Sequence, residues 1–531
     1  MKGPETNQHT TSASKADANG DDSAPTRAGG SLYKGSDARG FAGRVRHALA
    51  WRYGSQIMAQ IITWGSTLMV VRLLEPSDYG LFAMSQVVLA ALAFMNGWGF
   101  ANSLVQETEI DRRKIGQVFA LLLLLNGTLA VVQFLIAPLA AAYYGEPIVA
   151  DMLRVQAVLF LTTPFIALPS ALLSREIAFR SQGVANMAGA VTGAVSALTL
   201  AWFDFGVWAL VYAPLLAFSV RALVLTVSSR LLVWPVFDFR GAGAMVSYGG
   251  AMTVVQLLWI IQSQSDIFIA GRVFEPYELG LYSEALFLTL IVTGRFLPPL
   301  NEVAFPAYAE MHKQGRPLGP YFIRTLRAVA LITAPIYIGL ALTAPEAIGT
   351  IFGDKWLPMA PIVAGLALVM PAMALQIVCA PATNATGHAR ISVYTSLIGA
   401  VLFPLCFLVG ITNGPLGLVH AWWIAAPVLL IATLVLTLPV VQVGAVEFLR
   451  AILPAAVGCL AMACAVFALR MMLPDWPAPL RLLALAITGA LTYAAVMWFG
   501  WRALVDESLN LIRRRPLSVP EPGDRIQTTA G

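Results

Sequence analysis

The sequence predicts an all-α membrane protein that crosses the bilayer many times. Of its 531 residues, 58% are apolar and only 12% are charged, whereas soluble domains carry about 25% charged residues. Apolar stretches of about 20 residues, each long enough to span a hydrocarbon core of roughly 30 Å as a helix, recur from Trp51 to Trp501. A motif also occurs twice, which indicates two related halves. A soluble fold is excluded.

The apolar stretches and the polar breaks between them predict about 14 transmembrane helices. In chain order, the expected spans are residues 50–74, 79–102, 116–142, 150–173, 182–203, 206–229, 243–269, 279–306, 323–344, 357–382, 391–410, 414–440, 448–470 and 480–502.

Two polar segments flank the spans. Residues 1–48 are rich in Ser, Thr, Ala, Gly and Asp, and they have no apolar run able to form a core, so we expect a disordered tail. They also lack the apolar region of a secretory signal, so the first span is expected to act as its own insertion signal. Residues 504–531 are also polar, so we expect a second tail there.

Lys and Arg are unevenly distributed over the breaks between the spans. With the N-terminus inside, the cytoplasmic breaks hold most of them, for example Arg112 to Lys114 and Arg324 to Arg327, while the opposite breaks hold more acidic residues. By the positive-inside rule, both tails are expected to be cytoplasmic.

The repeated motif relates the two halves. VVRLLEPSDYGLF (70–82) matches IAGRVFEPYELGLY (269–282) at an offset of 200. Identical residues are Arg72 and Arg272, Glu75 and Glu275, Pro76 and Pro276, Gly80 and Gly280, and Leu81 and Leu281. An even number of spans separates the copies, so the repeats are expected to be parallel. We therefore predict an N-lobe (residues 49–240, helices 1–6), a C-lobe (241–445, helices 7–12) and two appended helices (446–503).

Three blocks carry a family resemblance. VVRLLEPSDYGLFAMSQVVLAALAFMNGWGFANSLVQ resembles the opening signature of Wzx-type oligosaccharide flippases, in the colanic-acid and exopolysaccharide branch. LPSALLSREIAFRSQGVANMAGAVTGAVSALTLAWFDFGVWALV and SDIFIAGRVFEPYELGLYSEALFLTLIVTGRFLPPLNEVAFPAYAEM are similar to that branch's following blocks. The resemblance covers residues 45–440 and extends to the MATE-like exporter superfamily (the MOP superfamily). Ser283-Glu284 departs from the Asn-Arg pair expected there.

The resemblance implies a flippase of the bacterial inner membrane. Its substrate would be an undecaprenyl-diphosphate-linked oligosaccharide, moved from the cytoplasmic to the periplasmic leaflet by alternating access for exopolysaccharide or lipopolysaccharide biosynthesis. Expected partners are this lipid-linked substrate, the bilayer and the polysaccharide polymerase machinery. The alternative is a multidrug or small-molecule exporter of the MATE type.

A diphosphate inside a membrane needs a cation, and an intramembrane arginine costs roughly 2.5 to 3.5 kcal/mol unless it meets water, a partner or substrate. Arg295, deep in the eighth predicted span, is the strongest candidate for substrate contact; the alternative is a bridge to Glu284 or Glu302. Pro298-Pro299 beside it predicts a break or kink. Arg221 and Arg52 are weaker candidates, because snorkelling or positive-inside anchoring also explains them.

Other polar residues within the spans have two interpretations each. Asn96, Asn102 and Gln262 are candidate sugar contacts, although such residues often join helices. Asp266 is a candidate coupling site for a proton or Na⁺, and a salt bridge to Arg272 is the alternative.

Three further predictions concern structure. Local bridges are expected in the two symmetric periplasmic turns, Arg72 with Glu75 and Arg272 with Glu275. The small residues spaced four apart from Ala185 to Ala197 predict a packing face and not a binding site. Trp422 and Trp423 are expected to be interfacial anchors.

Several function classes find no support. The basic residues form no stripe for nucleic acid, and the histidines and cysteines are too dispersed for a metal site. No cofactor motif or nucleophile–base arrangement occurs, so we expect neither a cofactor nor an enzyme.

Overall fold

The computed structural model describes residues 38–97, 100, 101, 104, 111–176, 179–229, 233–238, 243–473, 476–502 and 504, and leaves the side chains of 38–50, 52, 53 and 243–256 undescribed. The chain divides into two units, 1–47 and 48–531, and all helices that follow α1 belong to the second. Most of both predicted tails lies outside the described residues, although helix α1 begins at Ala38, before the predicted first span.

All regular elements in the described ranges are helical. In chain order they are α1 (Ala38–Leu73), α2 (Pro76–Ala93), α4 (Arg112–Tyr144), α5 (Ile148–Gln156), α6 (Val158–Arg175), α7 (Phe179–Trp202), α8 (Val207–Ser228), α9 (Gly243–Val273), α10 (Pro276–Lys313), α11 (Gly319–Leu342), α12 (Ala344–Ile351), η1 (Asp354–Met359), α13 (Ala360–Ile377), α14 (Cys379–Ala385), α15 (Ala389–Gly410), η2 (Ile411–Asn413), α16 (Gly414–Val441), α17 (Ala445–Met472) and α18 (Ala478–Gly500).

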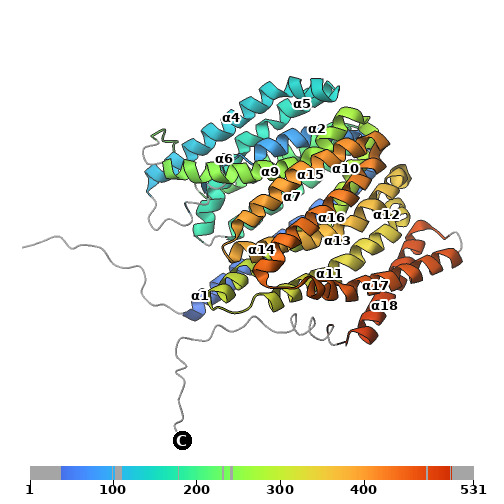
Figure 1. Ribbon diagram of the computed structural model, residues 1–531. Coiled ribbons are helices and arrows are strands. Elements are labelled where there is room, and N and C mark those ends of the chain that lie inside the picture. Colours follow the sequence, from blue (N-terminus) through green and yellow to red (C-terminus); the bar gives the residue numbers. More distant parts are fainter. Residues whose placement is uncertain are drawn as a thin grey trace, which may run out of the picture. The chain divides into compact units, whose positions relative to one another are not determined.

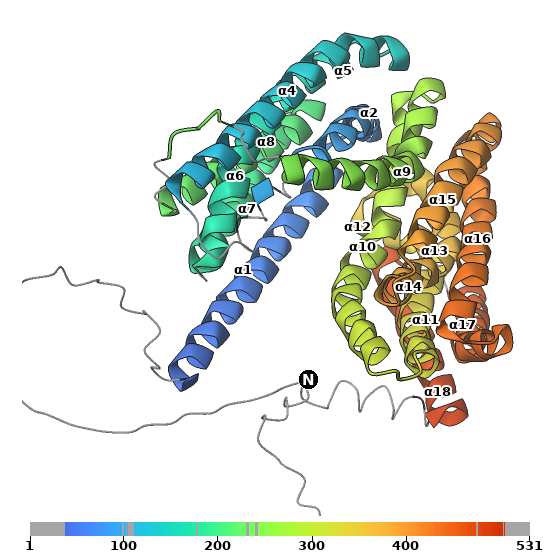
Figure 2. The same ribbon diagram turned by 60° about the vertical axis from the view of Figure 1, so that its left-hand side comes forward.

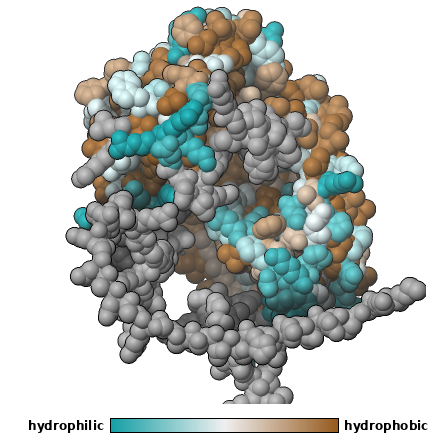
Figure 3. Space-filling model, turned by 90° about the vertical axis from the view of Figure 1, so that its left-hand side faces the viewer, coloured by the Kyte–Doolittle hydropathy of each residue, from teal (hydrophilic) through white to brown (hydrophobic). Residues whose placement is uncertain are grey.

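Ten stretches of the described chain are long and apolar enough to cross a membrane. One of them, Ala389–Val441, contains both α15 and α16. Helices α1, α2 and α9 are not among the ten, although each coincides with a predicted span. Large hydrophobic side chains such as Leu139 and Trp202 are exposed, and Figure 3 shows hydrophobic residues over much of one face. Such a surface is typical of a protein surrounded by lipid.

Within this unit the helices form two groups (Figures 1 and 2). In the first, α7 packs on α8, α6 on α8, and α4 on α6. In the second, α15 packs on α16, α13 on α16, and α11 on α13. Helices α17 and α18 pack on each other and on α11.

The two groups resemble each other down to single residues. A Cβ on Gly116, near the start of α4, would lie 2.8 Å from the Trp234 carbonyl oxygen, in the segment after α8. A Cβ on Gly319, at the start of α11, would lie 3.0 Å from the Val441 carbonyl oxygen, at the end of α16. In both places a side chain at the glycine would prevent the close approach of the backbone.

The groups meet where α2 and α10 begin, which is termed here the contact end. A Cβ on Gly80 would collide with the carbonyl oxygen of Pro276, and a Cβ on Gly280 with that of Pro76. The contact is therefore reciprocal between the two copies of the repeated motif. Proline suits the first turn of each helix, because the nitrogen there has no helical acceptor to lose.

The predicted bridges within these turns are absent from the described residues. Arg72 instead donates to the carbonyl oxygens of Thr350 and Ile351, at the end of α12, where a helix C-terminus attracts cations. Glu75 pairs with Lys355 at 3.3 Å. Arg272 lies over the Tyr143 ring, and Glu275 has no ion-pair partner in the part of the chain that the structure describes. The predicted bridge between Arg72 and Glu75 was wrong because each residue has a partner in the second group of helices.

One carboxylate joins the last two helices to α12. Glu346 is buried and pairs with Arg470 of α17 at 2.6 Å and with Arg481, near the start of α18, at 3.5 Å. These contacts tie three helix ends together.

Candidate functional site

A cavity of about 970 Å³ lies between α1, α2, α6, α7, α8, α9 and α10. Along α1 its wall runs from Ser55 to Val70, about 22 Å at 1.5 Å per residue. In the second group, α9 packs along α15, whereas α1 has no comparably packed helix face among the described residues. The cavity occupies the space that this difference leaves.

Polar side chains cover much of the wall. On α1, Gln56, Gln60, Thr63 and Thr67 recur every three or four residues, so they share one face of the helix. The other polar wall residues are Ser55, Ser66, Tyr79, Gln86, Ser170, Ser174, Gln182, Asn186, Gln264 and Ser283. Such a wall offers hydrogen bonds in a region where an unsatisfied polar group costs several kcal/mol.

Arg221 is the arginine of this wall within the described residues. Its Nε atom is buried and has no hydrogen-bond partner in the part of the chain that the structure describes. A Cβ on Gly189 of α7 would lie 3.3 Å from the Cβ of Arg221 and 3.1 Å from the carbonyl oxygen of Ala217. The absence of a side chain at Gly189 therefore lets the guanidinium stem lie against α7.

Glu284 of α10 is the carboxylate of the same wall. It forms no ion pair or hydrogen bond with another described side chain. Gln60, Gln86 and Asn186 also line the cavity, and their amides have no partner among the described residues. Among the described residues, the site thus offers one cation, one anion and free amide groups to a ligand.

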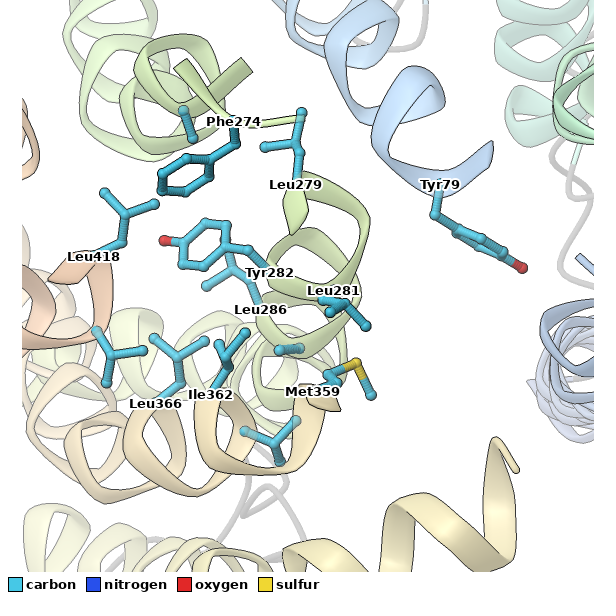
Figure 4. Close-up of a cluster of buried hydrophobic side chains, with 14 of the residues drawn as sticks. Tyr79, Phe274, Leu279, Leu281, Tyr282, Leu286, Met359, Ile362, Leu366 and Leu418 are labelled. Atoms are coloured by element: carbon cyan, nitrogen blue, oxygen red, sulfur yellow. The ribbon is translucent and has the colours of Figure 1, made fainter. Parts of the chain in front are cut away.

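Asp266 lies apart from this cavity, fully buried in the second group. One carboxylate oxygen accepts from the Ile267 amide at 2.8 Å, and the other accepts from the Tyr282 hydroxyl at 2.9 Å. The indole of Trp422 donates to the same hydroxyl at 2.9 Å, and Figure 4 shows Tyr282 among hydrophobic side chains that include Leu418. No Arg272 bridge occurs here, and Trp422 is a core residue, so predicting it as an interfacial anchor was wrong.

The remaining predicted contacts are placed as follows. Arg295 is exposed, does not line the cavity, and pairs with neither Glu284 nor Glu302 among the described residues. It lies on α10, which is continuous through Pro298 and Pro299 but curved (Figure 2). Gln262 packs against α15 at Gly399.

Two predicted contacts fall where little is described. Asn102 and the side chain of Arg52 lie outside the described residues. The backbone oxygen of Asn96 accepts from Asn126 at 2.9 Å, a bond that joins the segment after α2 to the middle of α4.

The small residues of α7 pack on α8, as predicted, because Gly193 would bring a Cβ to 3.1 Å from that of Ala217. Several of them also line the cavity, including Gly189 and Ala197. Classing this face as packing alone was therefore too narrow. The missed signal was the polar residues spaced three or four apart on α1, together with Gln182 and Asn186 on α7.

A sequence profile described as polysaccharide biosynthesis protein matches residues 69–361, which is more than half of the chain. The chain belongs to this family. The family's relatives include TuaB, a teichuronic acid biosynthesis protein of Bacillus subtilis (strain 168), which is 24% identical over 61% of this chain and 67% of its own length. ExoT, a succinoglycan biosynthesis transport protein of Rhizobium meliloti (strain 1021), is 24% identical over 88% of this chain and 96% of its own length.

A third relative, the lipopolysaccharide biosynthesis protein WzxC of Escherichia coli (strain K12), is 23% identical over 58% of this chain and 64% of its own length. The structure of the lipid II flippase MurJ in an inward closed conformation superimposes with a TM-score of 0.70 at 14% identity, covering 86% of this chain and 99% of that one. An inward-facing MATE transporter gives 0.55 at 13% identity, covering 77% and 98%. The family member described here therefore shares its fold with MurJ and with MATE transporters of the MOP superfamily.

Proposed function

We propose that the protein moves an undecaprenyl-diphosphate-linked oligosaccharide from the cytoplasmic to the periplasmic leaflet of the bacterial inner membrane. The observation that carries this proposal is the cavity of about 970 Å³, with its polar wall and its arginine. The hydroxyl and amide groups of the wall can form hydrogen bonds with the sugar hydroxyls of a glycan inside the membrane. Arg221 offers the diphosphate a charge-assisted hydrogen bond. The relatives named for polysaccharide biosynthesis support the substrate class.

Movement by alternating access is the second part of the proposal. We assign residues 49–240 and 241–445 to two parallel six-helix lobes, with 446–503 appended as two further helices. The matched packing of the two groups and the reciprocal Gly80 and Gly280 contact support this layout. With both termini cytoplasmic, the contact end is periplasmic, so the cavity would receive its substrate from the cytoplasmic side.

Two predictions about individual residues remain part of the proposal. Arg295 is exposed on α10 and free of carboxylate partners among the described residues, so it remains a candidate for substrate contact outside the cavity. Asp266 has neutral hydrogen-bond partners and no cation paired with it in the described part, which supports its role as a candidate proton or Na⁺ site.

Transport by purified protein in liposomes tests the function. Undecaprenyl-diphosphate-linked trisaccharide would be supplied, and its appearance in the other leaflet would be followed by digestion with an external glycosidase. We expect Arg221→Ala to lower the initial rate at least about tenfold, since a hydrogen bond to a charged group contributes about 1.5 to 3 kcal/mol, while Arg221→Lys retains part of the rate.

Arg154→Ala is the matched control, because that exposed arginine pairs with Asp151 and does not line the cavity. A wild-type protein that moves no lipid-linked glycan, or an Arg221→Ala variant at the full rate, would contradict the proposal.

One observation favours the MATE-type alternative. Glu284 places a carboxylate on the cavity wall, and exporters of cationic drugs need an acid to attract them. Drug-sensitivity profiles of a deletion strain separate the two functions: hypersensitivity to cationic drugs with normal polysaccharide would support the alternative.

A further inference from the structure

The cation and the anion of the cavity lie at different depths. The starts of α2, α8 and α10 all lie at the contact end. Gly80 of α2 abuts Pro276 of α10, and a Cβ on Gly206, just before α8, would lie 3.0 Å from the Asp78 carboxylate of α2. Glu284 follows the start of α10 by eight residues, about 12 Å, and Arg221 follows the start of α8 by fourteen, about 21 Å. The anion is therefore nearer to the contact end.

The neighbours of each charge differ as well. Gln182 and Asn186, early on α7, line the part of the cavity that is far from the contact end, as Arg221 does. Gln86, Gln264 and Ser283 line the part near Glu284. A molecule in the cavity thus meets a positive charge at one level and a carboxylate with hydroxyl and amide groups at the other.

We infer that the cavity orients its substrate and selects the glycan by charge, with the diphosphate at Arg221 and the distal sugars at Glu284. This inference rests on the proposed function. An unpaired carboxylate accepts hydrogen bonds from the hydroxyls of neutral sugars and attracts an amino sugar, whereas it repels an acidic sugar. Glu284 is therefore a specificity-determining residue, disfavouring repeat units whose distal sugar carries a carboxylate.

Three probes test the selection in the same liposomes. Each is a trisaccharide on undecaprenyl diphosphate, and the distal sugar is glucose, glucosamine with a free amine, or glucuronic acid. For the wild type we expect the glucuronate probe to move about tenfold more slowly than the glucose probe. Glu284→Gln should bring that ratio close to one, and Glu284→Asp should retain most of it.

Two further variants separate this effect from loss of folding or of diphosphate binding. Glu302→Gln removes an exposed carboxylate of the same helix that does not line the cavity, and it should leave the ratio unchanged. Arg221→Ala should slow all three probes by a similar factor, because all three share the diphosphate.

The outcomes distinguish the two levels of inference. If the wild type moves none of the probes, the proposed function fails. If it moves them but Glu284→Gln leaves the ratio of glucose to glucuronate unchanged, with or without a general loss of rate, the function stands and the selection by Glu284 is overturned.

Discussion

At the scale of single residues, the contact between Gly189 and Arg221 determines where the cavity holds its positive charge. We expect Gly189→Leu to displace the arginine and to fill part of the wall, because even a Cβ there meets the Ala217 oxygen at 3.1 Å. Transport of the glucose-terminated probe should fall at least about tenfold, as for direct loss of a charged hydrogen bond, while the protein still reaches the membrane.

Gly127→Leu is the control for this substitution, since Gly127 of α4 has nothing within 4 Å of the added Cβ. Normal transport by the Gly189→Leu variant would show that the position of Arg221 is unimportant.

The buried hydroxyl of Tyr282 supports a stability prediction. Tyr282→Phe removes a donor from Asp266 and an acceptor from Trp422, leaving buried polar groups unsatisfied at a cost of about 1 to 3 kcal/mol. Thermal unfolding in detergent should show a lower midpoint. Tyr277→Phe, at an exposed position on the same helix, should leave the midpoint unchanged, and equal midpoints for both variants would refute the role of the network.

Sequence reasoning predicted the charged residues of the site only in part. It identified Arg221 as a candidate, but it ranked Arg295 higher because depth within a span says nothing about which face of the helix a residue occupies. Glu284 was considered only as a bridge partner. The polar face of α1 was readable from spacing, yet each glutamine or threonine alone resembles an ordinary helix-packing residue.

At the scale of elements, the crossing of α2 and α10 depends on the absence of side chains at Gly80 and Gly280. Gly80→Val should force the two helix starts apart, because the added atoms would occupy the position of the Pro276 carbonyl. We expect the distance between spin labels at Ser77 and Tyr277 to increase, and the transport rate to fall.

Gly294→Val, in an open position of α10, should change neither the label distance nor the rate. An unchanged distance in the Gly80→Val variant would contradict this prediction, because it would mean that the contact end accommodates the valine without moving the two helix starts apart.

Helix positions followed well from apolar length, whereas helix ends and interruptions did not. The predicted span 150–173 is divided into α5 and α6, and 357–382 covers the end of η1, all of α13 and the start of α14. Periodicity alone does not show such breaks, because the residues on both sides are equally apolar. The partners of Arg72 were equally hidden, since Thr350 and Ile351 are distant in sequence and offer backbone oxygens.

At the scale of the whole molecule, the distribution of basic residues predicts the orientation in the membrane. Alkaline phosphatase, which is active only outside the cytoplasm, should be active when fused after Gly145 and inactive when fused after Ser229 or Gly531. Phosphatase activity from the last fusion would contradict the assignment of the contact end to the periplasm.

The two halves share a motif, but most of the cavity wall comes from helices of the first half, and α9 and α10 of the second half complete it. The motif indicates that the halves are related, yet it did not predict that α9 would pack along α15 while α1 borders the cavity and contacts α7 at Ser55 and Ser66. That difference depends on many weak contacts along whole helices, which a match of short turns does not report.

The shared carboxylate of Glu346 has a mechanical consequence. Glu346 pairs with Arg470 and Arg481 at once. We therefore expect α17 and α18, the final hairpin, to move together with the half that contains α12. A fluorophore carried on that hairpin, paired with one on α5, would therefore report rocking of the halves in real time without any label near the cargo.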